Sequence, residues 1–261
     1  MARIGNKTER QNQILKDLEQ KGDMTLQEIV STYGCSEATA RRDLEELELS
    51  GLIVRTIGGG AKYLRPEQVR EVPFREKQQA LYHEKMAIAR TAASLVHEGD
   101  VIGLTGGTTT YLIARELKHH RNITVVTNAV NIAMELSDNE GIQVVLTGGV
   151  LRNKSYELCG PLAEQTVKAV NIHTMFMGID GFTGDGVSTY SELEANIARM
   201  LMQRADRTVA VFDHTKIGRS SLFNVAGLSE LHGCITDGPM PASLAKALAD
   251  SHAALHLAEL G

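Results

Sequence analysis

The residues best suited to chemistry in this sequence are glycines and threonines that follow a predicted strand. The run Gly106-Gly107-Thr108-Thr109-Thr110 comes directly after the apolar stretch Val101–Leu104 and opens a predicted helix. Backbone N–H groups at such a turn, together with hydroxyl side chains, bind anions. The run fits neither GxGxxG nor GxxxxGK[ST], so a dinucleotide or a nucleoside triphosphate is not indicated. The turn therefore predicts a site for a smaller anion.

Other predicted strand ends carry polar groups of the same kind. Ligands of open α/β sheets bind beyond the carboxyl ends of the strands, so we expect these groups to gather at one edge and to suit a phosphorylated polyol. A lysine there would supply charge to a phosphate, and a carboxylate would bind sugar hydroxyls. Each turn taken alone also fits an ordinary βα connection, and a first-turn glutamate also fits the helix dipole. The expected effector-binding residues are Thr105, Gly106, Gly107, Thr108, Thr109, Thr127, Asn128, Gly148, Gly149, Arg152, Glu192 and Lys216.

The same residues leave an enzymatic alternative open. Glu192, Asp213 and Lys216 are candidates for acid–base chemistry on a sugar phosphate, as in an isomerase or a deaminase. We expect no metal and no cofactor, because the histidines form no HxH or HExxH pattern and the three cysteines form no CxxC pair. The sparse, unpaired cysteines are typical of a reducing cytosol.

A second set of candidate residues lies on a predicted helix that Ser36 caps. With Ala40 and Leu44 facing inward, its outward or sideways residues include small side chains and arginines near the N-terminal end. A recognition helix presents that end to the major groove of DNA, where arginine pairs with guanine. The alternative for Arg42 is an ion pair with a neighbouring carboxylate on the same helix. The expected DNA-binding residues are Glu37, Ala38, Thr39, Arg41 and Arg42, with Arg55 and Lys62 close to phosphates.

The elements around this helix predict a winged helix-turn-helix. A helix from Thr8 ends at Lys21-Gly22, and Thr25 with Glu28 three residues later has the spacing of a capping box. Gly34 ends that second helix, and the Ser36 helix follows. Residues 52–57 and 61–64 read as two strands that flank three glycines, which predicts the wing.

We expect three regions along the chain. Residues 1–64 form the winged helix-turn-helix, residues 65–85 form a charged linker with two of the five prolines, and residues 86–261 form a sensor domain. In the last region strands and helices alternate, which predicts an α/β fold with a mostly parallel sheet covered on both faces. The predicted strands are Val101–Leu104, Ile123–Thr127, Gln143–Leu146, His173–Met177, Thr208–Phe212 and a short strand near Cys234–Thr236.

Composition limits the class of protein. The net charge is −5, so affinity for nucleic acid must come from the local arrangement of charges rather than from a basic chain. The chain has no Trp and 4% aromatic residues, which disfavours aromatic cages and base-stacking platforms. No apolar run approaches the length that spans a membrane, and the first residues lack the apolar region of a signal peptide. We expect a cytoplasmic protein with no membrane partner.

The sequence resembles the DeoR family of transcriptional regulators over nearly its whole length. The stretches RQNQILKDLEQKG and TLQEIVSTYGCSEATARRDLEELELSGLIVRTIGGGA are similar to the family's helix-turn-helix. The series GGTTTYLIA, VVTNAVNIA, VLTGGVLR, CGPLAEQ, FMGIDGF, GVSTYSELEA and FDHTKIGRSS is similar to its sensor domain. Two positions depart from the family's pattern, because Thr105 and His173 stand where relatives often carry Asp.

The resemblance implies a function and a set of partners. The sensor fold of the family is similar to ribose-5-phosphate isomerase, glucosamine-6-phosphate deaminase and CoA-transferase domains, and its usual ligands are phosphorylated sugars. We therefore expect a repressor of a carbohydrate-catabolism operon, a homo-oligomer (a dimer or a tetramer) that binds double-stranded operator DNA. A phosphorylated sugar would release it from DNA.

Overall fold

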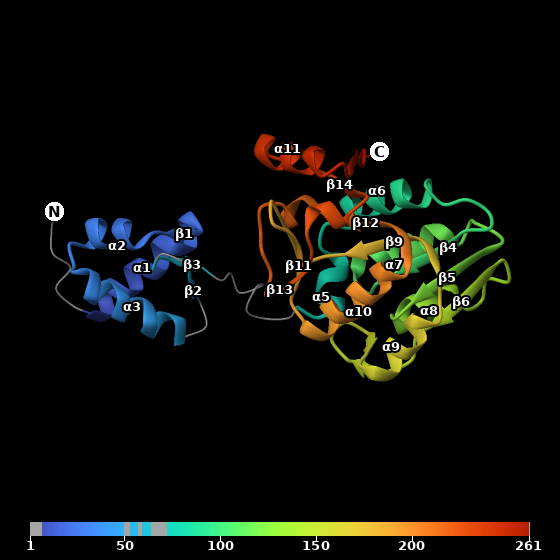
Figure 1. Ribbon diagram of the computed structural model, residues 1–261, viewed down its shortest axis with the longest axis horizontal. Coiled ribbons are helices and arrows are strands. Elements are labelled where there is room, and N and C mark those ends of the chain that lie inside the picture. Colours follow the sequence, from blue (N-terminus) through green and yellow to red (C-terminus); the bar gives the residue numbers. More distant parts are fainter. Residues whose placement is uncertain (1–6, 50–52, 57–58, 64–71, 261) are drawn as a thin grey trace. The chain divides into compact units, whose positions relative to one another are not determined.

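The computed structural model describes residues 7–49, 53–56, 59–63 and 72–260 (Figure 1). The chain divides into two compact units, Met1–Glu71 and Val72–Gly261. Of the stretch 65–85 that we expected to link two domains, residues 65–71 lie outside the described residues. Residues 72–85 belong to the second unit, where they form helix α5 (Phe74–Gln79) and the start of α6 (Tyr82–Ala93).

The first unit is a winged helix-turn-helix, as predicted. Its helices are α1 (Lys7–Lys21), α2 (Leu26–Tyr33) and α3 (Glu37–Leu49). Its strands β1 (Asp23–Met24), β3 (Ala61–Tyr63) and β2 (Ile53–Arg55) form an antiparallel sheet in that order. Strand β1 was not predicted, and the ends of the two predicted wing strands fall partly outside the described residues.

Local signals in the sequence explain the helix ends of this unit. Thr25 accepts a hydrogen bond from the backbone N–H of Glu28 at 3.2 Å, and the Glu28 carboxylate accepts one from the Thr25 N–H at 2.7 Å. This reciprocal pair is the predicted capping box. Gly34 ends α2 in the left-handed conformation, at φ 60°, which glycine adopts without a Cβ clash. The buried core includes Ile14, Leu18, Ile29, Ala40 and Leu44.

The second unit is built on a seven-stranded sheet with the order β15-β14-β12-β9-β4-β5-β6. All neighbouring strands in it are parallel, so the predicted fold class is confirmed. The strands are β4 (Val101–Leu104), β5 (Ile123–Thr127), β6 (Ile142–Leu146), β9 (Ile172–Gly178), β12 (Ala205–Val211), β14 (Gly233–Thr236) and β15 (Ala254–Leu257).

Helices cover both faces of this sheet (Figure 1). One buried cluster contains apolar side chains of α6, α7 (Thr108–Leu117) and α8 (Val130–Leu136). The other contains those of α9 (Pro161–Lys168), α10 (Glu192–Gln203) and α11 (Ala242–Asp250). Burial on both faces explains why the strands read as apolar runs in the sequence.

Several short elements were not predicted. Strands β7 (Val150–Arg152) and β8 (Glu157–Cys159) form an antiparallel hairpin. Strands β10 (Gly181–Thr183), β11 (Gly186–Thr189) and β13 (Phe223–Ala226) form a small antiparallel sheet. The hairpin follows the carboxyl end of β6 and β10 follows that of β9, so both additions begin at the edge where we expected the ligand site.

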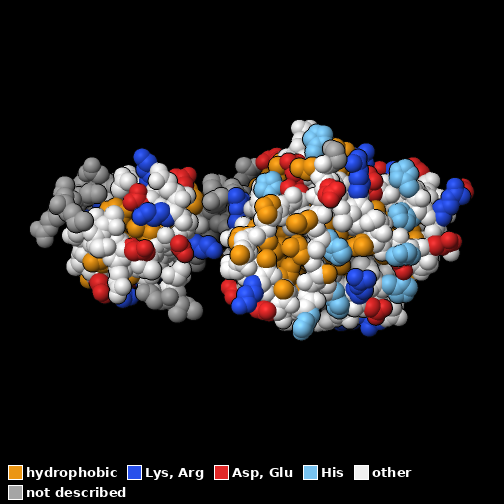
Figure 2. Space-filling model, turned by 90° about the horizontal axis from the view of Figure 1, so that it is seen from above, with side chains coloured by type: hydrophobic (Ala, Val, Ile, Leu, Met, Phe, Trp, Pro, Cys, Tyr) orange, Lys and Arg blue, Asp and Glu red, His pale blue; other side chains and the backbone are white. Residues whose placement is uncertain are grey.

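Exposed hydrophobic side chains gather on the visible face of the second unit (Figure 2). The exposed large hydrophobic residues of this unit include Leu222 and, along and after the edge strand β15, Leu255, Leu257 and Leu260. Within the part of the chain that the structure describes, no helix has the length and apolar character needed to cross a membrane.

Candidate functional site

The first candidate site is the exposed N-terminal half of α3. Ser36 accepts a hydrogen bond from the backbone N–H of Thr39 at 3.2 Å and so caps the helix. The inward residues Ala40 and Leu44 are fully buried. Of the residues expected to contact DNA on this helix, Thr39 is half-buried, and those that are exposed are Glu37, Ala38, Arg41 and Arg42.

Three carboxylates follow Arg42 closely on α3 (Asp43, Glu45 and Glu46), and two of them are bound by cations of another helix. The Asp43 side chain is 2% exposed, and its carboxylate accepts a hydrogen bond from Nε of Arg10 at 2.6 Å. Glu46 receives Nζ of Lys7 at 2.6 Å. Both cations come from α1, so helix packing engages these carboxylates and leaves the Arg42 guanidinium on the outer face.

The two wing residues that were expected to contact phosphates, Arg55 and Lys62, have different surroundings. Arg55 extends its Nη1 to Oε1 of Glu45 at 3.1 Å, so the third potential partner of Arg42 is also engaged. A DNA contact by Arg55 would compete with that ion pair. Lys62 is half-buried on β3. Arg41 lies 3.8 Å from Glu37 one turn earlier, a distance at which an exposed pair contributes little stability.

Two glycines of the wing are required by close packing. Gly59 has φ 84°, and a Cβ there would lie 3.2 Å from Nη1 of Arg41. A Cβ on Gly60 would lie 2.5 Å from the carbonyl oxygen of Met24. The wing therefore packs directly against the start of α2 and against the Arg41 side chain of the recognition helix α3. Gly58, the first glycine of the predicted turn, lies outside the described residues.

The second candidate site lies at the carboxyl ends of β4 and β5. Thr105 accepts a hydrogen bond from the Gly178 N–H at 3.0 Å. Thr127 donates to the Leu104 carbonyl at 2.8 Å and accepts from the Ala129 N–H at 3.1 Å. These two hydroxyls, both expected to face a ligand, instead join neighbouring strand ends. Both threonines lie at the edge where the sequence predicted them, but their hydrogen bonds are made to backbone groups of the protein itself.

A buried carboxylate that the sequence did not indicate lies on the Gly106 turn. Glu157 is 6% exposed and accepts hydrogen bonds from the Gly106 backbone N–H and from Nδ2 of Asn128, the latter at 2.9 Å. A Cβ on Gly106 would lie 2.2 Å from Cγ of Glu157. Burial, and next the charge of Glu194, raise the pKa of Glu157 well above its ordinary value. The turn thus binds a carboxyl group of its own chain.

A chain of polar contacts extends from this carboxylate across the edge. Arg152 contacts Glu194 at 3.2 Å between Nε and Oε1. The Thr189 hydroxyl lies 3.4 Å from Glu194 and 3.0 Å from Asp180, which in turn receives Nζ of Lys77 at 2.8 Å. Burial acts to raise the pKa of Asp180, but Lys77 lowers it to about 2. Charges of both signs therefore line the edge.

Lys85 is a further residue that sequence reasoning missed. It is 5% exposed, and its Nζ donates to the carbonyl oxygens of Lys77 and Ala80 at 2.9 and 2.7 Å. Burial lowers its pKa to about 8; the charge of Asp213 opposes this effect, and those of Lys216 and Lys77 add to it. A single lysine among the buried alanines of α6 was the available signal.

The remaining expected residues have varied surroundings. Glu192 is exposed at the start of α10, and Glu194 is the carboxylate that reaches Arg152, because the first turn of a helix directs residues two apart to different sides. Gly148 and Gly149 have φ 71° and 115°, and a Cβ on Gly149 would lie 2.7 Å from a backbone oxygen. Among the described residues, the hydroxyls of Thr108 and Thr109 have no hydrogen-bond partner.

Helix α5, the first element of the second unit, is attached to this site. The Phe74 N–H donates to the Lys154 carbonyl at 2.8 Å, and Nε of Arg75 donates to the Tyr156 hydroxyl at 2.8 Å. The Phe74 and Tyr156 rings pack edge to face at 5.5 Å. Lys154 and Tyr156 belong to the β7–β8 hairpin that carries Glu157, so α5 is held by the same hairpin that contacts the Gly106 turn.

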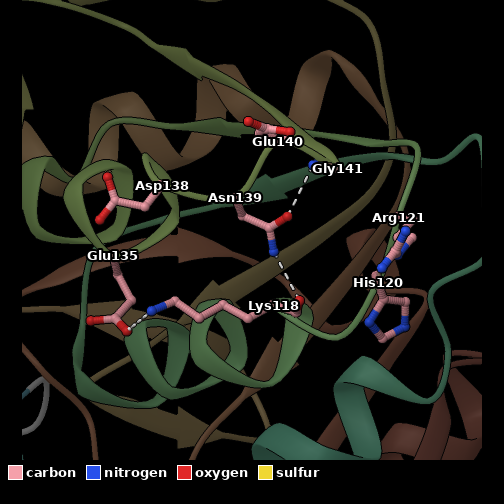
Figure 3. Close-up of a pocket in the computed structure, with 8 residues that line it drawn as sticks. All are labelled: Lys118, His120, Arg121, Glu135, Asp138, Asn139, Glu140 and Gly141. Atoms are coloured by element: carbon pink, nitrogen blue, oxygen red, sulfur yellow. Dashed lines mark hydrogen bonds and ion pairs between the residues drawn. The ribbon is translucent and has the colours of Figure 1, made fainter.

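A separate pocket of about 490 Å³ lies at the opposite edge of the sheet, next to the amino ends of β5 and β6. Figure 3 shows Lys118 extended toward Glu135, which it contacts at 2.5 Å, and Asn139 bonded to both the Lys118 carbonyl and the Gly141 N–H. These contacts fix the loops before the two strands. None of the residues expected to bind an effector lines this pocket.

A winged helix-turn-helix with an exposed arginine pair, followed by an α/β unit with a polar edge, defines a DNA-binding regulator with a sensor domain. Residues 10–66 match the family model of the DeoR-like helix-turn-helix domain, and residues 81–238 match that of the DeoR C terminal sensor domain. The chain belongs to the DeoR family of transcriptional regulators.

Curated relatives align over nearly their full length. The chain is 33% identical to the putative aga operon transcriptional repressor of Escherichia coli O157:H7, covering 92% of this chain and 90% of the relative. It is 30% identical to the glycerol-3-phosphate regulon repressor of E. coli K12, covering 96% and 98%. It is 34% identical to the transcriptional repressor GlcR of Bacillus subtilis, covering 86% of each.

Solved structures show more distant likeness. Ribose 5-phosphate isomerase A of Methanocaldococcus jannaschii aligns with 51% of this chain and 52% of its own, at 19% identity and a TM-score of 0.36. The 4-hydroxybutyrate CoA-transferase of Porphyromonas gingivalis aligns with 65% and 52%, at 13% identity and a TM-score of 0.40.

Proposed function

We propose that the protein represses a carbohydrate-catabolism operon and that a phosphorylated sugar releases it from DNA. The observation that carries this proposal is the attachment of α5 to the polar edge of the sheet through Lys77 and the β7–β8 hairpin. This helix follows directly on the segment that leads from the winged helix. The names of relatives, which include an aga operon repressor and a glycerol-3-phosphate regulon repressor, support the operon class.

The DNA-binding step requires the exposed end of α3 to enter the major groove. Arg41 and Arg42 would pair with base edges, Ala38 and Thr39 would contact thymine methyl groups, and Lys62 would approach phosphates. A homo-oligomer would place two recognition helices in successive half-sites. The exposed hydrophobic side chains of the second unit (Figure 2) supply apolar surface for that association.

The effector would bind at the carboxyl ends of the parallel strands. The Gly106 turn and the start of α7 offer backbone N–H groups and the free hydroxyls of Thr108 and Thr109 to a phosphate. Lys216 ends the 3-10 helix His214–Lys216, which follows the carboxyl end of β12, so it would supply a cation near the same edge. Glu194 and Asp180 would accept hydrogen bonds from sugar hydroxyls.

Release from DNA needs a difference in effector affinity between two states of the protein. A coupling free energy of roughly 1–3 kcal/mol is typical of such regulators. Because α5 is fixed by Lys77 to Asp180 and by Arg75 to Tyr156, a ligand that rearranges either contact changes how the connection to the winged helix begins.

The test uses the full chain and an operator obtained by selection from random double-stranded DNA. Fluorescence anisotropy then measures release by glycerol 3-phosphate, glucose 6-phosphate, glucosamine 6-phosphate and N-acetylglucosamine 6-phosphate, with the unphosphorylated sugars as matched controls. The proposal expects release by at least one phosphate and by none of the free sugars. A protein that binds its operator equally well in all of these solutions would contradict it.

A further inference from the structure

We propose that Glu157 is the resident occupant of the Gly106 turn and that the phosphate of the effector displaces it. This inference rests on the proposed function and deepens it, because it states what the effector must exchange with. It predicts that Glu157 sets the effector concentration at which the protein responds, instead of contributing to effector binding.

The first argument is the space at the turn. The Glu157 side chain fills the position that a Cβ would take on Gly106, with Cγ, Cδ and Oε1 at 2.2, 2.3 and 2.4 Å from it. These side-chain atoms are the three nearest neighbours of that position. A phosphate that approached the Gly106 N–H from this side would meet the same atoms, so carboxylate and phosphate exclude one another.

The second argument is an exchange of hydrogen bonds. The donors that Glu157 uses are the Gly106 N–H and Nδ2 of Asn128, and Asn128 is fully buried. If Glu157 left and nothing replaced it, a buried amide donor would lose an acceptor. A phosphate oxygen accepts from both donors, so the exchange keeps them satisfied.

The third argument is charge. Burial, and next the charge of Glu194, disfavour the ionised form of Glu157 and raise its pKa. A phosphate added beside Glu157 would disfavour the ionised form of this carboxyl further, since like charges in a poorly solvated site interact strongly. Departure of Glu157 from the turn removes that unfavourable interaction.

Displacement also provides a route to α5. Glu157 is the first residue of β8, and Tyr156 before it has a left-handed backbone at φ 62° while its hydroxyl receives Arg75. A movement of Glu157 off the turn therefore changes the hairpin segment that holds α5. The Ser155 hydroxyl in the same turn is buried without a partner among the described residues, so no side-chain hydrogen bond of Ser155 opposes a rearrangement.

The main experiment compares phosphate affinity in four full-length proteins by calorimetry, with inorganic phosphate and glucose 6-phosphate as probes. Glu157→Gln keeps the shape and removes the charge, and Glu157→Ala removes the occupant. We expect Glu157→Ala to bind inorganic phosphate about tenfold more tightly than wild type, and Glu157→Gln, whose amide still fills the turn, to gain less. Glu259→Gln, at an exposed carboxylate, should bind like wild type. Equal or weaker binding in both variants overturns the proposal and makes Glu157 a contact to the ligand.

A double-mutant cycle tests the occupancy of the turn without any ligand. Gly106 is not among the glycines with a positive φ, so alanine is compatible with its backbone. Gly106→Ala should lower the melting temperature by several degrees in wild type, and by much less in the Glu157→Ala background, where the clash is gone. Equal lowering in both backgrounds overturns the proposal.

The two proposals fail separately. If no sugar phosphate releases wild-type protein from DNA, while the Glu157 variants still gain phosphate affinity, the proposed function is wrong and Glu157 remains the occupant of an anion site. If a sugar phosphate releases wild type and the variants respond only at higher concentrations, the proposed function stands and the displacement model is wrong.

Discussion

Nε of Arg10 lies 2.6 Å from Oδ2 of Asp43, and this contact joins α1 to the recognition helix α3 in the core of the first unit. The Asp43 side chain is 2% exposed and that of Arg10 13%. This pair connects the inner face of α3 to α1 and engages the Asp43 carboxylate. The Arg42 guanidinium remains exposed on the outer face, where it acts electrostatically on Glu46.

We first predict that Arg42→Ala loses operator affinity with the fold intact. A base contact by arginine contributes roughly 1–3 kcal/mol and determines specificity at one position. Gel shift at fixed salt with the selected operator and single-base variants measures both. Lys16→Ala removes the same charge from an exposed position of α1 and serves as the matched control. If Arg42→Ala binds the operator with unchanged affinity, the proposal that α3 enters the major groove is wrong.

The second prediction concerns the pair itself. Asp43→Ala leaves the guanidinium of Arg10 partly buried without its carboxylate, so we expect the first unit to lose about 3 kcal/mol of stability. Glu46→Ala breaks the exposed pair with Lys7 and should cost less than about 1 kcal/mol. Scanning calorimetry of the full chain compares the two variants. Similar small losses in both would show that the buried pair contributes no more than the exposed one.

Our third prediction is that Lys216→Ala weakens the effector response by about tenfold and leaves operator binding without effector close to wild type. Lys216 is half-buried beside the polar edge and acts electrostatically on Lys85 and Asp180. Lys246→Ala, on the exposed face of α11, is the matched control. Calorimetry that gave equal sugar-phosphate affinity for Lys216→Ala and wild type would exclude Lys216 from the site.

The fourth prediction is a pH dependence of stability that originates at Lys85. Its pKa is about 8 in the folded protein against 10.5 for an unperturbed lysine, because burial disfavours the charged form. Between these values the unfolded chain binds the extra proton, so Lys85 makes stability rise with pH, by up to about 3 kcal/mol. Below pH 8 the destabilisation that comes from burying the charged form of Lys85 is fully present.

The comparison that isolates this residue is Lys85→Met, which removes the titrating group and keeps much of the volume. Its free energy of unfolding, relative to wild type, should fall as pH rises from about 8 to 10. Lys246→Met should show no such trend, because Lys246 is exposed. A constant difference between Lys85→Met and wild type across this range would mean that Lys85 keeps its ordinary pKa.

Sequence patterns predicted the features that depend on nearby residues. The capping box of Thr25 and Glu28 and the end of α2 at Gly34 both follow from signals within a few residues. Six of the seven strands of the parallel sheet were also predicted, because burial on both faces leaves a continuous apolar run, whereas the more exposed edge strand β15 was missed. The short strands β7 and β8 were missed, since three residues are too few to show a period.

The candidate site was predicted in position but not in detail. The strand ends gather as expected, yet the hydroxyls of Thr105 and Thr127 bind backbone groups, which only the neighbouring strand determines. Glu157 and Lys85 were missed because their burial comes from segments distant in sequence, the Gly106 turn and the carbonyl groups at the end of α5. No local pattern marks the contact of Glu157, and the one signal for Lys85 is its place as the single lysine among the alanines of α6.

The last prediction separates a ligand role of the Gly106-Gly107-Thr108-Thr109 turn from a structural one. Gly107 has φ 126°, so Gly107→Val should destabilise the protein whether or not a phosphate binds there. Loss of effector response in that variant alone therefore decides nothing. Thr109 is 7% exposed at the start of α7, and its hydroxyl has no partner among the described residues, so its removal leaves no internal hydrogen bond broken.

We expect Thr109→Ala to keep its operator affinity and to lose no more than a few degrees in melting temperature, while the effector concentration needed for release rises about tenfold. Thr109→Ser restores the hydroxyl and should restore the response, whereas Thr109→Val, which keeps the volume without the hydroxyl, should behave like Thr109→Ala. This order of the three variants follows only if the hydroxyl donates to the ligand. If Thr109→Ala is as stable as wild type and is released at the same effector concentration, the phosphate binds elsewhere on the edge.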